Sequence, residues 1–198
     1  MTKGRLEAFS DGVIAVIITI MVLELKSPAD GTLAALRTLL PTFLGYVLSF
    51  LHVGIYWNNH HHLFQTVERV NGRVLWANLH LLFWLPLVPF VTSWMGNTGF
   101  ARTPVILYGV VLLLAAIAYF VMTQALLAGH ATNSPMAQAI SEGRKERISL
   151  AIYGLAIGAA FIHPYLGCAG YGLVAAIWLV PDRRIELVVK KHGERASD

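Results

Sequence analysis

Long hydrophobic stretches separated by short polar breaks run along the whole chain. Each stretch is close to the length that crosses a bilayer core of about 30 Å. We place six of them at residues 6–26, 38–62, 73–94, 104–128, 147–165 and 167–181. The breaks carry turn residues, at 26–31, 71–72, 96–99, 132–135 and 163–164. The pattern predicts an all-α polytopic membrane protein, with six transmembrane helices in a single domain over residues 1–198.

Composition and charge agree with this class. The chain is 56% hydrophobic and 13% charged, against about 25% charged residues in soluble domains. With a cytoplasmic N-terminus, 12 of the 15 lysines and arginines fall in inside segments, and only Lys26, Arg37 and Arg102 fall outside. The positive-inside rule then places both termini in the cytoplasm, which requires an even number of spans. The net charge of +4 therefore reflects topology, and we expect no nucleic-acid partner.

The first hydrophobic stretch carries an acid at its start. Asp11 precedes the run Gly12 to Leu25, in which Glu24 is the only charged residue. An ionisable group in hydrocarbon costs about 2.5–3.5 kcal/mol on insertion scales, so Asp11 requires a partner or a function. Farther along the same helix, Val16, Ile20 and Leu23 fall within about 60° of one another and form a stripe. On residues alone, ordinary helix packing is the usual explanation of such a stripe.

The polar start and the apolar run together resemble a known signature. Arg5 is followed by Phe9-Ser10-Asp11-Gly12 and then by the run with Thr19, and farther on come Tyr56-Trp57-x-x-x-His61, Asn78 and Pro89-Phe90. This arrangement resembles the FSD-motif potassium channels, the bacterial relatives of the endolysosomal channel transmembrane protein 175. The resemblance implies a potassium-permeable homotetramer of the bacterial plasma membrane, in which the first helix of each subunit lines the pore. It implies no enzymatic activity, and the partners we expect are further copies of the chain, the lipid bilayer and potassium ions.

The resemblance also gives the stripe a role. In this family the positions of Val16, Ile20 and Leu23 line the axis and form the constriction, and Thr19 would add a ring of hydroxyl groups. The chain contains no Thr-Val-Gly-Tyr-Gly carbonyl filter. Selectivity would then arise at rings of side chains, where a hydrophobic constriction gates by dewetting.

A second set of residues would anchor the pore helix. Trp57 and His61 lie four residues apart, so they share one helix face at the depth of Asp11, and either could hydrogen-bond it. The resemblance implies that this pair holds Phe9, Ser10 and Asp11 in place. For Arg5 we expect a partner on another helix, Glu68 or a lipid phosphate.

Three alternatives remain open at this point. His60, His61 and His62 suggest a metal, but successive helical residues point about 100° apart and three cannot converge from one chain. A proton-coupled transporter would use Asp11 and His61 as its relay, and a membrane-embedded enzyme or metal carrier would use Asp11 with the histidines. We expect no metal and no cofactor besides the permeant ion.

We also expect residues 104–128 to face lipid, and Gly154-x-x-x-Gly158 to pack helices within the chain.

Overall fold

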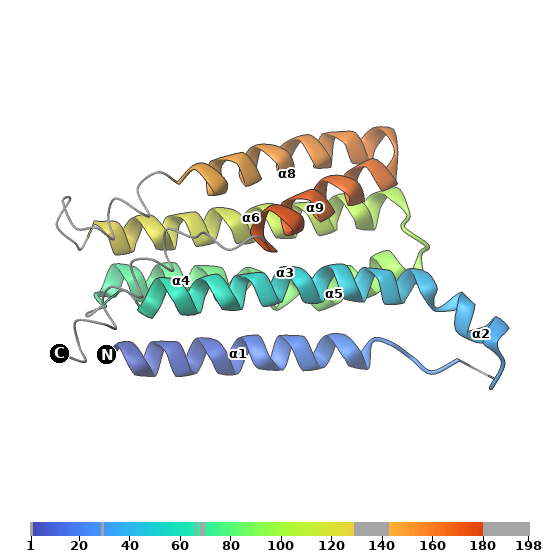
Figure 1. The fold of residues 1–198 in the computed structure, drawn as a ribbon, viewed down its shortest axis with the longest axis horizontal. Helices are drawn as coiled ribbons and strands as arrows, with labels where there is room; N and C mark the ends of the chain where they lie inside the picture. Colours follow the sequence, from blue (N-terminus) through green and yellow to red (C-terminus); the bar gives the residue numbers. More distant parts are fainter. Residues whose placement is uncertain (1, 29, 66, 68–69, 129–142, 180–198) are drawn as a thin grey trace.

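The computed structural model describes residues 2–28, 30–65, 67, 70–128 and 143–179, and every regular element within them is a helix (Figure 1). In chain order these helices are α1 (Lys3–Leu23), α2 (Leu33–Thr38), α3 (Leu40–Gln65), α4 (Gly72–Trp84), α5 (Leu87–Asn97), α6 (Arg102–Leu127), α8 (Arg144–Ile162) and α9 (Pro164–Leu179). The all-α prediction is confirmed. The predicted break at 132–135, the proposed partner Glu68 and the end of the last segment at 181 lie outside the described residues.

The long helices run in alternate directions, so that α1, α3, the α4–α5 pair, α6, α8 and α9 make successive passes (Figure 1). Four of these passes, from α1 to α6, are 21–26 residues long and apolar enough to cross a membrane. The last two are shorter, at 19 and 16 residues. Sixteen residues span about 24 Å at 1.5 Å per residue, less than a typical bilayer core. The prediction of six spans is therefore approximately right, and its last two members are the marginal ones.

The third predicted segment, 73–94, is broken rather than continuous. α4 ends at Trp84 and α5 begins at Leu87, with Pro86 between them as the N-cap of α5. Proline has no backbone N–H and its ring clashes with the preceding turn, so it interrupts a helix. The Val88 amide instead donates to the Leu85 carbonyl oxygen over 3.0 Å. The two halves still form one pass.

The connection from α1 to α3 contains a short helix that the sequence pattern did not predict. α1 ends at Leu23 rather than at residue 26, and α2 follows at Leu33–Thr38. The Thr32 hydroxyl oxygen caps α2 by accepting a bond from the Ala35 amide, 3.2 Å away. Asp30 in turn accepts bonds from the Thr32 amide and hydroxyl. The loop is thus ordered by local side-chain contacts.

The helix expected to face lipid lies inside the subunit. α6 contacts α4, α5, α8 and α9, and Tyr108, Leu112 and Met122 on it are fully buried. Gly109 permits the close approach of α9, because a Cβ at this position would lie 2.0 Å from the Tyr171 hydroxyl oxygen. The expectation of a lipid-facing helix was wrong, because purely aliphatic composition suits a protein neighbour as well as it suits lipid.

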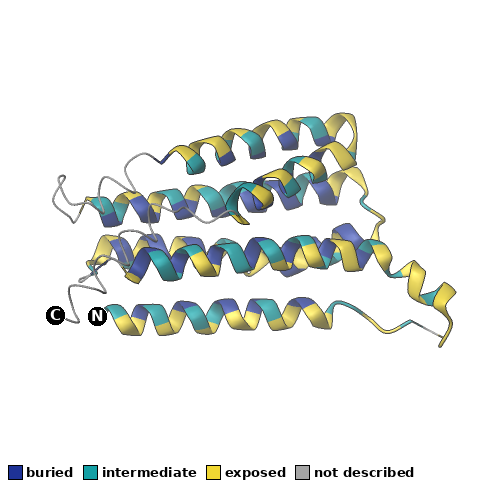
Figure 2. Cartoon of the chain, in the orientation of Figure 1, coloured by how far each residue is buried: buried dark blue, intermediate teal, exposed yellow. Residues whose placement is uncertain are grey.

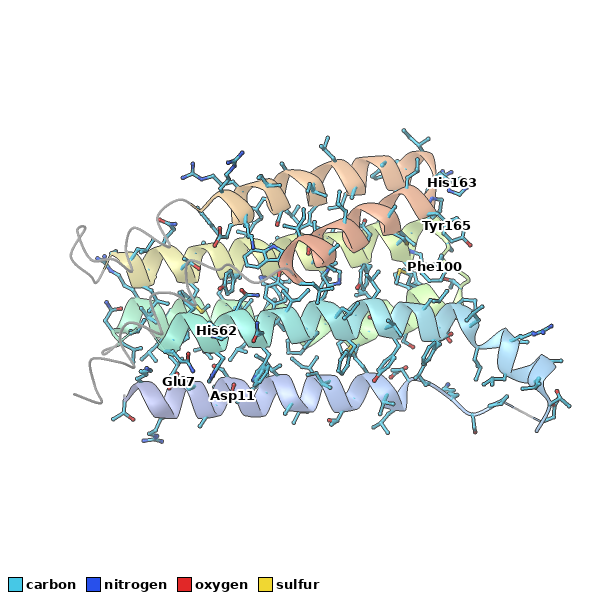
Figure 3. All side chains as sticks on the ribbon, in the orientation of Figure 1. Glu7, Asp11, His62, Phe100, His163 and Tyr165 are labelled. Carbon is cyan, nitrogen blue, oxygen red and sulfur yellow. The ribbon has the colours of Figure 1, made fainter. Side chains whose placement is uncertain are left out.

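The last two helices form a tight hairpin at the predicted His163-Pro164 break, which Figure 3 shows beside Phe100 and Tyr165. Their close contact does not use the predicted glycine pair, since nothing lies within 4 Å of a Cβ placed at Gly154 or Gly158. Gly167 and Gly170 of α9 take that role instead. A Cβ at Gly167 would meet the Ala160 Cβ at 2.7 Å, and one at Gly170 would meet the Ala156 Cβ at 2.4 Å. The prediction for Gly154 and Gly158 within the chain is therefore wrong.

Candidate functional site

The first helix has one covered face and one uncovered face. Figure 2 shows buried residues on the side of α1 that faces α3 and exposed residues on the opposite side. The covered face consists of Leu6, Ser10, Ile14, Ile17 and Met21. Their spacing of three or four residues is that of a helical stripe packed against neighbours.

The uncovered face carries the predicted constriction residues. Val16, Ile20 and Leu23 are 54%, 42% and 76% exposed. Thr19 is exposed beside them, and its hydroxyl donates to the Val16 carbonyl oxygen over 2.9 Å. That bond uses the hydroxyl hydrogen and leaves the oxygen lone pairs available. The four residues thus share an apolar surface with one polar position, and no helix of the described subunit covers it.

A directed chain of hydrogen bonds joins the start of α1 to α3 and α4. Because the Asn78 Oδ1 can only accept, the His60 Nε2–H donates to it over 2.8 Å. The Asn78 Nδ2 donates to the Ser10 Oγ over 3.0 Å, and the Ser10 hydroxyl donates to the Leu6 carbonyl oxygen over 2.9 Å. All three side chains are buried. A buried polar group without a partner costs about 1–3 kcal/mol, so this network fixes the three helices in register.

Asp11 has the partner that its position requires. The Trp57 Nε1–H donates to the Asp11 Oδ1 over 3.0 Å, which is one of the two alternative hydrogen bonds that the sequence suggested. His61 does not contact the acid by a hydrogen bond. Its ring stacks on Trp57 with centroids 5.9 Å apart, and its Nε2 accepts a bond from the Gln65 amide over 2.8 Å. His61 therefore stacks against the tryptophan, and among the described residues Trp57 holds the carboxylate.

The remaining motif residues lie on open surface. Phe9 is 51% exposed, and Arg5 is exposed, with no ion-pair partner among the described residues. Figure 3 shows Glu7 and Asp11 on the side of α1 that faces α3, near His62. Within the part of the chain that the structure describes, no three histidine, cysteine or acidic side chains are placed to hold a metal.

Sequence reasoning missed two contacts of α1. One is the central role of His60 and Asn78, because the tryptophan spacing drew attention to His61. The other is at the far end, where the Ser93 hydroxyl donates to the Glu24 Oε2 over 2.6 Å and the Asn97 Nδ2 donates to the Ser93 Oγ over 3.2 Å. Polar residues within apolar spans require partners, so pairing such residues by depth could have suggested both contacts.

These features define a multi-pass helical membrane protein with an anchored first helix, and comparison with known proteins gives its family. Residues 5–89 match the family described as "Endosomal/lysosomal potassium channel TMEM175". A potassium channel of Chryseobacterium sp. (strain P1-3) is 55% identical over 192 residues, which cover 97% of this chain and 100% of the relative. The chain belongs to the TMEM175 family.

Two further comparisons bear on structure and on function. The fold matches the crystal structure of a lysosomal potassium-selective channel TMEM175 homolog from Chamaesiphon minutus, with a TM-score of 0.78 and 29% sequence identity, over 90% of this chain and 96% of that one. The human protein named endosomal/lysosomal proton channel TMEM175 is 34% identical over 116 residues, which cover 52% of this chain and 23% of the human protein.

Proposed function

We propose that the protein is a potassium-permeable cation channel of the bacterial plasma membrane, in which four copies surround a central pore lined by α1. The observation that carries the proposal is the uncovered stripe of Val16, Ile20 and Leu23 on a helix whose opposite face is packed. The potassium-channel names of the bacterial relatives support the choice of ion.

Assembly follows from the number of candidate pore helices. One subunit supplies one α1, and a single helix cannot enclose an aqueous path. Closed rotational symmetry is the usual arrangement of identical subunits. A ring of subunits would cover the exposed side of α1 and turn its stripe towards a common axis.

The stripe would then act as a constriction. Positions 16 to 23 span about 10 Å along a helix. Aliphatic rings over this length disfavour water, so an ion must lose part of its hydration shell to pass. Potassium holds its water less tightly than sodium and crosses at lower cost, while the Thr19 oxygen could replace some of the lost water.

The polar contacts at the start of α1 would keep these rings aligned. The bond from Trp57 to Asp11 and the chain from His60 through Asn78 to Ser10 both join α1 to neighbouring helices. We assign them a structural role, and we place both chain termini in the cytoplasm because of the lysine and arginine distribution.

The Val16→Asn variant tests the proposal in lipid bilayers. Four amides in the constriction should admit water, so the conductance should rise and the preference for potassium over sodium should fall. Val22→Asn is the matched control, because Val22 is 47% exposed but lies about 120° around the helix from Val16. Reversal potentials under potassium/sodium bi-ionic conditions and under a proton gradient measure both variants.

Three outcomes would contradict the proposal. A Val16→Asn tetramer with unchanged current and selectivity would place the pore elsewhere. Saturating fluxes without single-channel steps would favour the proton-coupled carrier. Proton currents without potassium currents would mean that the protein is a channel for protons and not for potassium.

A further inference from the structure

The outer face of α8 is not covered by any other described part of the subunit. The opposite side of this helix packs against α6 and α9 and contains the buried residues Ser149, Tyr153, Ala156 and Ala160. Figure 2 shows exposed residues along the outer side, and in Figure 1 α8 lies on the side of the bundle away from α1. This placement rests on the proposed function in one respect: if α1 lines a shared axis, the outer face of α8 lies at the periphery of the assembly and meets the bilayer.

One end of the outer face is basic and the rest of it is apolar. Arg144 and Arg147 are exposed in the first turn of α8, and Ile148, Leu155 and Ile162 are 40%, 75% and 77% exposed. At about 100° per residue, all five fall within a sector of roughly 100°. The apolar part, from residue 148 to residue 162, is about 21 Å long, which exceeds half the thickness of a bilayer core of about 30 Å. The face therefore fits a molecule with a charged head and a long apolar chain.

The surface beside these apolar side chains is low. Ala151, Gly154 and Gly158 are exposed on the same side of α8, and nothing lies within 4 Å of a Cβ placed at either glycine. An extended acyl chain therefore has room beside Leu155. This shape fits any apolar chain, so the charges at the start of the face decide which molecule it binds.

The two arginines carry a positive charge that no acid on the outer face balances. They are three residues apart, so they are neighbours on the helix surface, and neither forms an ion pair with another described residue. Lys145 lies over the Trp178 ring, 6.0 Å from its centroid. Glu146, the only acidic residue of α8, faces inward and lines a small cavity among α3, α6, α8 and α9. Guanidinium groups bind phosphate oxygens through paired hydrogen bonds, so a phosphate group is the partner that this end of the face lacks.

The same charges disfavour a second copy of the chain on this face. All copies have one orientation in a membrane. Two outer faces that meet about an axis along the membrane normal would bring Arg144 and Arg147 against the same two residues of the other copy, and like charges placed opposite one another repel. A lipid phosphate would neutralise these arginines instead.

We propose that the outer face of α8 binds an anionic phospholipid, whose phosphate group contacts Arg144 and Arg147 and whose acyl chain lies along the face beside Leu155. Basic side chains at the membrane surface attract anionic lipids. A zwitterionic lipid is less suitable, because its own cationic group would lie close to the two arginines.

The test measures lipid binding to the full-length protein by native mass spectrometry, with phosphatidylglycerol and phosphatidylcholine of identical acyl chains. We expect one site per chain that prefers phosphatidylglycerol. The attraction of one basic side chain to anionic lipid corresponds to about fivefold in affinity. The double variant Arg144→Gln/Arg147→Gln should therefore weaken phosphatidylglycerol binding roughly ten- to thirtyfold and leave phosphatidylcholine binding unchanged. Arg102→Gln, at an exposed position that begins α6, is the matched control and should change neither.

Two further measurements separate the headgroup from the chain and lipid from protein. An excess of glycerol 3-phosphate should not displace phosphatidylglycerol, because it lacks the acyl chain. Leu155→Gln places a polar group along the path of the chain, so it should weaken phosphatidylglycerol binding. The mass of the protein assembly in detergent, measured by light scattering, should be the same for Leu155→Gln as for the wild-type protein.

Several results would overturn the proposal. Equal affinities of the wild-type protein for the two lipids, or undiminished phosphatidylglycerol binding to the double arginine variant, would exclude an anionic lipid at this face. Displacement by glycerol 3-phosphate would mean that the chain contributes nothing, and an altered mass of Leu155→Gln would assign the face to a second copy. The wild-type comparison and the Leu155→Gln variant remain decisive even where the double variant does not fold. Since none of these measurements is a current, their failure would leave the proposed pore unaffected.

Discussion

α1 and α6 are both apolar helices long enough to cross a membrane, yet the subunit holds them in different ways. The apolar window of α6 has a mean hydropathy of 2.7 and is 50% buried, whereas that of α1 has a mean hydropathy of 2.1 and is 28% buried. α6 packs closely against α9 through Gly109. α1 is pinned by hydrogen bonds near its two ends, at Ser10 and Asp11 and again at Glu24.

The difference separates two ways of placing an apolar helix. Close packing against four other helices buries half of the apolar window of α6. Hydrogen bonds near its two ends fix the position and rotation of α1, while one apolar face stays uncovered. A helix that is to line a pore shared between subunits has to be held by a few contacts, as α1 is. The face that lines the pore must stay free of other helices of its own subunit.

The largest effect should come from the packing of α6. In Gly109→Ala the new methyl group would meet the fully buried Tyr171, whose hydroxyl donates to the Val105 carbonyl oxygen. Overpacking of this kind costs about 1–3 kcal/mol, or a fall in Tm of roughly 2–12 °C. Thermal unfolding in detergent measures it. Gly154→Ala is the control and should be neutral or slightly stabilising, because nothing lies within 4 Å of its Cβ. Equal stabilities of the two variants would mean that α6 is not closely packed.

The second-largest effect should come from the hydrogen bonds that hold the start of α1, made by Asn78 and Trp57. Asn78→Leu removes both the acceptor of His60 and the donor to Ser10, so we expect a loss of about 2 kcal/mol. Trp57→Phe removes only a bond made by a side chain that is 44% exposed, and it should cost less than about 1 kcal/mol. The fraction of protein that keeps its native elution volume after heating, read by size-exclusion chromatography, ranks the two. A larger loss for Trp57→Phe would make Asp11, and not Ser10, the main anchor.

The contact between Glu24 and Ser93 at the far end of α1 should affect the potassium current more than stability. If Glu24 lies at the pore mouth, Glu24→Gln should lower the potassium current about twofold at roughly 10 mM salt and hardly at all near 1 M, because exposed charges are screened there. Ser93→Ala keeps the charge and removes only the hydrogen bond, so it should leave the low-salt current unchanged. A salt-independent effect of Glu24→Gln would exclude the electrostatic explanation.

The smallest effect should appear in the loop after α1. Hydrogen bonds from the Thr32 hydroxyl and amide lower the pKa of Asp30 below its ordinary value of 3.8. A lowered pKa stabilises the folded loop at pH values above 3.8, and this contribution is lost as the pH falls through the lowered pKa. Hydrogen exchange of the α2 amides should therefore quicken, relative to the intrinsic rate, between pH 5 and about pH 3. Asp30→Asn should show no such change, and a wild-type protein without it would mean that Asp30 does not order α2.

Much of the fold could be predicted from the sequence, because whether a segment can cross the bilayer depends on the length and composition of that segment. The apolar stretches, the turn at Asn71-Gly72 and the break at His163-Pro164 were all predicted, as was a bond between Trp57 and Asp11. Pro86 was visible in the chain, although the interruption it makes in the third segment was not predicted. These features depend on local chemistry that each residue carries with it.

Only the tertiary structure decided which face of each helix is covered. A helix that is apolar all round gives no sign of its orientation, since lipid and protein neighbours are equally suitable for leucine and valine. This is why α6 proved central, why Gly167 and Gly170 rather than Gly154 and Gly158 make the close contact, and why His60 rather than His61 joins the buried network. The rotation of a membrane helix is set by a few small residues and polar pairs, and those act only once their partners on other helices are in place.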